Sequence, residues 1–127
     1  MRCLRSSFST RFMKLSELIE LAEQEVAAIK HVLPDDVKAH AQQCPVHFEA
    51  APAFGDEDML GVFEGASLID EAGPDSLPSI RIFVDRIWEY VETDEQDFLD
   101  EVGTTYLHEL GHYLGWDEEE VAQRGLE

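Results

Sequence analysis

An α+β fold, arranged as a single compact domain, is predicted by two helical patterns that flank a set of short strands. Apolar residues recur every three to four positions over 15–29 and again over 95–114. Between these segments, short apolar stretches alternate with glycines, prolines and acids, as is typical of strands and turns. A chain of 127 residues is long enough to bury one hydrophobic core.

The first helix is predicted from about Leu15, with Ser16 and Glu17 near its start. Its apolar residues alternate with glutamates at helical spacing, so we expect the leucines to lie in the core. Pro34 and the two aspartates after it predict a second, shorter helix that ends at about Gln43, because proline is tolerated in a first turn.

Three strands are expected between the helices. The segment 46–50 alternates apolar with polar residues, which places His47 on a solvent face. The segment 59–65 predicts a short strand inside a long irregular region, and 79–84 is the clearest strand pattern of the chain. Residues 86–91 are expected to connect this strand to the last helix or to form a helical turn.

The last helix is predicted over 95–114, a run without proline. Thr93 and Gln96 have the spacing of a capping box, and the acids beside them favour a helix N-terminus. The apolar positions expected to face the core are Phe98, Val102, Thr105, Leu107, Leu110 and Leu114.

This helix carries the sequence His108-Glu109-Leu110-Gly111-His112. Residues four apart lie on one face of a helix, so His108 and His112 can present two nitrogens to one cation. Zinc binds such nitrogens, and a catalytic zinc site keeps one position for a water whose pKa the metal lowers. Glu109 lies beside this face, where a carboxylate can take the proton of that water. The alternative is an amphipathic helix whose histidines only pack or form hydrogen bonds.

A third protein ligand is expected just after the helix. Gly115 occupies a position where helices commonly end in a left-handed residue, and acids follow it at once. The full pattern matches H-E-x-x-H-x-x-G with Glu118 ten residues after His108, where metzincin-type peptidases carry their third ligand. Asp117 is the alternative ligand. Asp117 can instead cap a last short helix over 118–124, and both readings hold if one acid caps and the other binds the metal.

The stretch 104–121 resembles the small bacterial minimal zincin-like metallopeptidases, a domain family long labelled as of unknown function. The resemblance extends from about Met13 to Glu127 through the N-terminal helix, the Pro-Asp-Asp segment and the strand at 79–84. It implies a compact zincin-like α+β domain with a small sheet and a zinc site. In zincins the strand beside the motif helix commonly lies at a sheet edge, so the strand at 79–84 is either that platform for a peptide or an interior strand.

The function expected from these residues is zinc-dependent hydrolysis of a peptide bond. His108, His112 and Glu118 or Asp117 would hold Zn²⁺, and Glu109 would act as general base and then protonate the leaving amine. The alternative is a zincin-like protein-binding module with a structural or vestigial metal site. Hydrolysis of a non-peptide amide by the same ligands is a third possibility. The other histidines, His31, His40 and His47, have no metal-type partner at helical spacing.

Charge and composition exclude several other classes of protein. Nine Lys and Arg residues against 28 Asp and Glu residues give a net charge of −19, which argues against nucleic acid as a partner. The acids provide a solvated surface or a preference for basic peptides. No stretch approaches the ~20 apolar residues of a membrane span. Two cysteines, Cys3 and Cys44, are too few for a disulfide framework and fit a reducing cytoplasm.

The first twelve residues differ in composition from the rest of the chain. They contain Arg2, Arg5 and Arg11 but no acid. We expect residues 1–12 to be a poorly ordered or atypical extension, produced by a start codon assigned too far upstream, and 13–127 to be the domain. A targeting peptide has a similar composition, and contact with a partner is a further reading.

Overall fold

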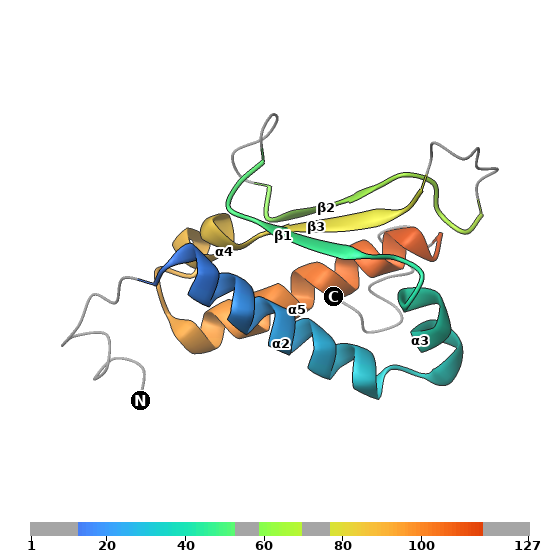
Figure 1. Cartoon of the computed structure of the whole chain (residues 1–127), viewed down its shortest axis with the longest axis horizontal. Helices are drawn as coiled ribbons and strands as arrows, with labels where there is room; N and C mark the ends of the chain where they lie inside the picture. The colour runs from blue at the N-terminus through green and yellow to red at the C-terminus, as the bar shows by residue number, and fades with distance from the viewer. Residues whose placement is uncertain (1–12, 53–58, 70–76, 116–127) are drawn as a thin grey trace.

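The computed structural model describes residues 13–52, 59–69 and 77–115. This part of the chain forms the mixed α+β fold expected from the sequence, a compact set of helices on a small sheet (Figure 1). In chain order the elements are α2 (Leu15–Val32), α3 (Asp35–Ala41), β1 (Val46–Glu49), β2 (Gly61–Glu64), β3 (Ser79–Phe83), α4 (Val84–Tyr90) and α5 (Glu95–Tyr113).

The sheet has the strand order β1-β3-β2, so β3 is its central strand. β1 runs parallel to β3, with Phe48 opposite Ile82, and β2 runs antiparallel, with Gly61 opposite Ile82 on the other side. The strand predicted at 79–84 is therefore the interior strand of this sheet. It does not have the edge position that a platform for a peptide requires. Its alternate residues Ile80 and Ile82 are fully buried in the hydrophobic core on one face of the sheet.

Helices α2 and α5 pack against each other beneath one face of the sheet (Figure 1). The apolar stripe of α2 and the buried face of α5 meet the inner residues of β3 there, which explains the helical periodicity seen in the sequence. The buried residues shared by these elements are Leu18, Ala22, Val26, Ile80, Ile82, Phe98, Val102, Tyr106 and Leu110.

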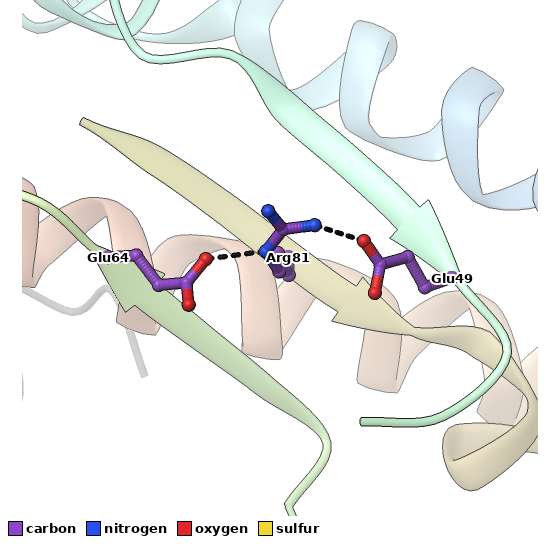
Figure 2. Close-up of polar contacts among 3 residues, drawn as sticks. All are labelled: Glu49, Glu64 and Arg81. Atoms are coloured by element: carbon purple, nitrogen blue, oxygen red, sulfur yellow. Dashed lines mark hydrogen bonds and ion pairs between the residues drawn. The ribbon is translucent and has the colours of Figure 1, made fainter. Parts of the chain in front are cut away.

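The opposite face of the sheet is polar and carries a three-residue ion-pair bridge. Arg81 of the central strand lies between Glu49 of β1 and Glu64 of β2, and its guanidinium binds both carboxylates (Figure 2). The Nε of Arg81 donates to Glu64 Oε1 at 2.5 Å. Both carboxylates raise the pKa of Arg81, with the hydrogen bond to Glu64 as the largest cause. One side chain therefore links all three strands on this face.

The last helix begins at Glu95 as predicted, but the turn between α4 and α5 corrects the residue predicted to cap it. Glu92 and Thr93 both have positive φ, at 55° and 61°, and the Thr93 hydroxyl donates to the Glu92 carbonyl at 2.6 Å. A residue with this left-handed backbone cannot act as the extended N-cap, so the predicted capping box at Thr93 is wrong. Asp94 caps the helix instead, and its carboxylate accepts a hydrogen bond from the Asp97 amide at 2.9 Å.

Other expectations agree closely with the structure. α2 begins at the predicted residue, and α3 follows Pro34 but ends two residues before Gln43. His47 is exposed on β1, and the segment expected as a connection or helical turn belongs to α4. Within the described residues, no helix is long and apolar enough to cross a membrane. The extension at 1–12 and the expected short helix at 118–124 lie outside the described residues.

Candidate metal centre

The two motif histidines lie together on the half-buried face of α5. His108 and His112 are one helical turn apart, with their Nε2 atoms separated by 3.2 Å. Their ring centroids are 4.7 Å apart and the ring planes cross at 84°. The regular helix from Asp94 onward produces this arrangement, because it keeps residues four apart on one face. The two Nε2 atoms therefore lie next to each other beside the helix.

This spacing fits a shared zinc ion. Two nitrogens bound to one tetrahedral zinc at ~2.0–2.1 Å lie about 3.3 Å from each other. The observed 3.2 Å between the Nε2 atoms of His108 and His112 matches that separation. In the absence of a cation, one imidazole donates its Nε2 proton to the other at the same distance. A cation held by both nitrogens would take the place of that hydrogen bond.

The third ligand expected from the sequence lies outside the described residues. Neither Asp117 nor Glu118 belongs to the ranges 13–52, 59–69 and 77–115. In those ranges, no three His, Cys, Asp or Glu side chains form a group that could hold a metal ion. The other three described histidines, His31, His40 and His47, are exposed on other elements, away from α5.

The helix end that leads toward these acids has the predicted conformation. Gly115 adopts a φ of 86°, the left-handed backbone expected for a residue that ends a helix. A side chain there would meet Ile69, since a Cβ on Gly115 would lie 2.7 Å from the Ile69 Cγ2. The segment after β2 thus crosses the end of α5, where the Leu68 amide also donates to the Tyr113 carbonyl at 2.8 Å.

Edge strand β2 runs along α5 beside the motif. Gly61, at the start of β2, lies against Thr105 and Glu109. Phe63, two residues later, packs on Tyr113 with ring centroids 5.8 Å apart. These two contacts are on the same face of the strand, because side chains alternate along it. β2 therefore lies along the part of α5 that carries the motif.

A half-buried carboxylate extends the same row of α5 toward its N-terminus. Thr105 lies one turn before Glu109, and its hydroxyl donates to Glu101 Oε2, one further turn back, at 3.4 Å. Burial raises the pKa of Glu101, and the hydrogen bond from Thr105 opposes that rise. Thr105 itself is 7% exposed. Glu101, Thr105 and Glu109 thus form one row along α5, and Thr105 and Glu109 of that row lie against the edge strand β2.

The tyrosines near the motif are core residues. Tyr106 is fully buried, and its hydroxyl has no hydrogen-bond partner among the described residues. Tyr113 is 3% exposed. Burial is the main cause that raises the pKa of both phenols. Both therefore pack in the core, whereas Tyr90 on α4 is 65% exposed.

Sequence reasoning missed Gly61 as a residue of this region. Thr105 was expected only as a core position of the last helix. The available signal was a glycine inside an apolar strand pattern, which often marks a close approach of another element. Thr105, the residue that Gly61 approaches, lies more than forty positions later in the sequence, so no local pattern identifies the contact.

Comparisons with known proteins agree with the fold. The model of a family described as "Zincin-like metallopeptidase" matches residues 35–126. No protein of curated function matches the chain. The structure is similar to that of a conserved hypothetical protein from Thermus thermophilus, with a TM-score of 0.53 and 28% sequence identity. That similarity covers 87% of this chain and 99% of the other. The matched region runs from α3 through α5 and beyond it, and the chain belongs to the family of zincin-like metallopeptidases.

Proposed function

We propose that this chain is a zinc-dependent peptidase whose catalytic face is the His108–His112 turn of α5. The observation that carries the proposal is the 3.2 Å separation of the two Nε2 atoms, which suits two ligands of one tetrahedral zinc. The family assignment supports the same reaction class. The substrate in this proposal is a peptide or protein.

The residues have separate roles in the proposed reaction. His108 and His112 would hold the metal through Nε2, and Glu118 or Asp117 would be the third protein ligand. When bound, zinc supplies Lewis acidity that polarises the scissile carbonyl and makes water more acidic. Glu109 accepts the proton of the attacking water through its carboxylate and then delivers it to the leaving amine. General acid–base catalysis of this kind contributes about 10²–10⁴ in rate.

The edge strand β2 provides the substrate platform in this proposal. Within the described part of the chain, β2 pairs only with β3, so its other edge can take a further strand. An extended peptide can add there by main-chain hydrogen bonds, as in other cases of strand addition. The contacts of Gly61 with Glu109 and of Phe63 with Tyr113 place this edge along the motif. The platform is thus β2, and not the strand at 79–84.

The substrate preference and the cellular compartment in this proposal are based on the net charge and on the state of Cys44. A net charge of −19 favours basic over acidic peptides and disfavours nucleic acid. Cys44 is a free, buried thiol, which fits a reducing compartment such as the cytoplasm. Membrane association is not part of the proposal.

A peptide-pool assay tests the proposal directly. Zinc-loaded parent protein, Glu109→Gln and His112→Ala are incubated with a mixture of unstructured peptides, and new termini are identified by mass spectrometry. We expect cleavage by the parent protein and at least a hundredfold slower cleavage by both variants, because each removes one part of the machinery. His47→Ala, which removes an exposed histidine on β1, serves as the matched control and should cleave like the parent.

Three results would redirect the proposal. Equal cleavage by the parent and Glu109→Gln would point to a contaminating peptidase and remove the support for this mechanism. Bound zinc without any peptide cleavage would favour the protein-binding module with a structural metal. Cleavage of a small non-peptide amide, but not of peptides, would keep the residues' roles and change the substrate class.

A further inference from the structure

Strand β2 approaches α5 so closely at Gly61 that no side chain fits there. A Cβ on Gly61 would lie 2.5 Å from the Thr105 Cγ2, 3.1 Å from the Arg81 carbonyl oxygen and 3.8 Å from the Glu109 Cγ. Two carbon atoms in ordinary van der Waals contact are about 3.5–4.0 Å apart. Any residue other than glycine at this position must therefore displace β2, α5 or both.

The Thr105 methyl group cannot easily move out of the way. Thr105 is 7% exposed, and its hydroxyl donates to Glu101 Oε2 at 3.4 Å. A β-branched side chain has few χ1 positions on a helix, so rotation of the methyl group would break this hydrogen bond or strike the preceding turn. The Arg81 carbonyl oxygen, the second close atom, belongs to the central strand of the sheet. The displacement is therefore transmitted to the backbone of α5 or β2.

A displacement of α5 or β2 at this place would also move Glu109. It follows Thr105 by one helical turn on the same face of α5, and it also touches the space beside Gly61. At the other end of the strand, the contact between Phe63 and Tyr113 keeps β2 on the helix. A side chain at Gly61 would therefore tilt the strand against α5 and shift the carboxylate, while β2 stays attached.

We infer that Gly61 is a positioning residue: its missing side chain sets the distance between the edge strand and Glu109, and Thr105 transmits that distance. The kinetic consequence rests on the proposed peptidase function, whereas the structural coupling between the strand and Glu109 does not. A misplacement of about 1 Å in a catalytic group can lower a rate by about a hundredfold. A displaced Glu109 would therefore lower turnover even in a variant that folds.

Four variants separate this role from a general packing effect. Gly61→Ala introduces the colliding atom. Thr105→Ser removes the methyl group that it would strike and keeps the hydroxyl that binds Glu101. The double variant combines both changes. Gly103→Ala is the matched control, because it adds a methyl group to the α2-facing side of the same helix, where the nearest atom is the flexible end of Ile29 at 3.0 Å.

Two measurements are made on each zinc-loaded variant. The γ-methylene resonances of Glu109, assigned by NMR, report the surroundings of the carboxylate without requiring any activity. The kcat and KM values for a peptide cleaved by the parent protein report the kinetic effect. Zinc content is determined in parallel, so that loss of metal is not mistaken for displacement of Glu109.

We expect Gly61→Ala to shift the Glu109 resonances and to lower kcat by about ten- to a hundredfold with KM changed less and zinc retained. The double variant should return both readouts to the values of Thr105→Ser alone. Gly103→Ala should match the parent. If Gly61→Ala does not fold, folding of the double variant with the resonances of Thr105→Ser supports the same coupling.

Unchanged Glu109 resonances in Gly61→Ala would overturn the inference, and so would a double variant as perturbed as Gly61→Ala. If the parent binds zinc but cleaves nothing, the proposed peptidase function fails. In that case the NMR comparison still decides whether Gly61 positions Glu109, so the two failures are distinguishable.

Discussion

Phe63 of the edge strand and Tyr113 at the end of α5 pack ring against ring, with centroids 5.8 Å apart and planes at 45°. Tyr113 directly follows His112, so this contact attaches β2 to the helix just past the candidate metal centre. Together with the contact at Gly61, it makes the edge of the sheet and the motif helix one unit. The predictions below follow from that attachment and from the groups around it.

Removal of the Phe63 ring should destabilise the domain measurably. Phe63 is half-buried and Tyr113 is 3% exposed, so Phe63→Ala leaves a gap against a buried ring. We expect a loss of about 2 kcal/mol in the free energy of unfolding, and about 1 kcal/mol for Phe63→Leu, which keeps most of the apolar volume. Urea unfolding followed by fluorescence measures both. Equal stability of the parent and Phe63→Ala would show that β2 does not depend on this contact.

The bridge on the outer face of the sheet should stabilise the strands only weakly and in a salt-dependent way. Arg81→Met removes the guanidinium that joins Glu49 and Glu64. We expect a small decrease in Tm at low ionic strength that narrows at about 0.5 M NaCl, because salt screens exposed charges. Glu49→Gln combined with Glu64→Gln should show the same salt dependence. A decrease that is unaffected by salt would indicate packing of the Arg81 stem instead.

The half-buried carboxylate of Glu101 should make stability depend on pH. Burial raises its pKa in the folded chain above the ordinary value of about 4.3 for the unfolded chain. The folded state therefore holds this proton more tightly, so its contribution is complete below the ordinary pKa and is lost as pH rises through the raised folded pKa. Glu101→Gln should match the parent near pH 4 and exceed it in Tm by about 1–3 °C at pH 7.

Thermal unfolding from pH 4 to pH 8 measures this difference. Glu20→Gln on α2 removes an exposed carboxylate and controls for the change in net charge. A parent protein that becomes more stable than Glu101→Gln as pH rises would contradict the assigned direction. Such a result would mean that the ionised carboxylate is held by a favourable partner.

Cys44 should be an unreactive thiol while the domain is folded. It is 1% exposed, and burial raises its pKa to about 11, so little thiolate exists at neutral pH. In a Cys3→Ser background, we expect labelling by a thiol reagent to be slow in native buffer and fast in denaturing urea. Complete labelling within seconds in native buffer would contradict the buried position.

The sequence predicted the local structure that carries the motif. The positions of His108, Glu109 and His112 depend on a single regular helix, and the spacing of apolar residues is sufficient to identify that helix. The left-handed Gly115 follows from the same local rules. The start of the helix at Glu95 was predicted correctly, but its N-cap was misassigned. Thr93 and Asp94 both suit an N-cap, and the left-handed turn that decides between them is not visible in composition.

Long-range pairing could not be predicted in the same way. The strand at 79–84 has the clearest apolar alternation because it lies at the centre of the sheet. That alternation does not tell which of the other strands lies beside the motif helix. The edge beside the motif is β2, a short strand in a region dominated by glycine, proline and acids. Its contact with Thr105 and Glu109 joins residues that are distant in sequence.

The most direct test of the metal centre is zinc content by elemental mass spectrometry. Untagged protein is purified without chelator and compared with Glu109→Gln, His112→Ala and the surface control His47→Ala. We predict near-stoichiometric zinc in the parent, in Glu109→Gln and in His47→Ala, and loss of zinc in His112→Ala. A parent protein without metal even after zinc is supplied, or equal zinc in His112→Ala, would contradict the proposal that His108 and His112 share a metal ion.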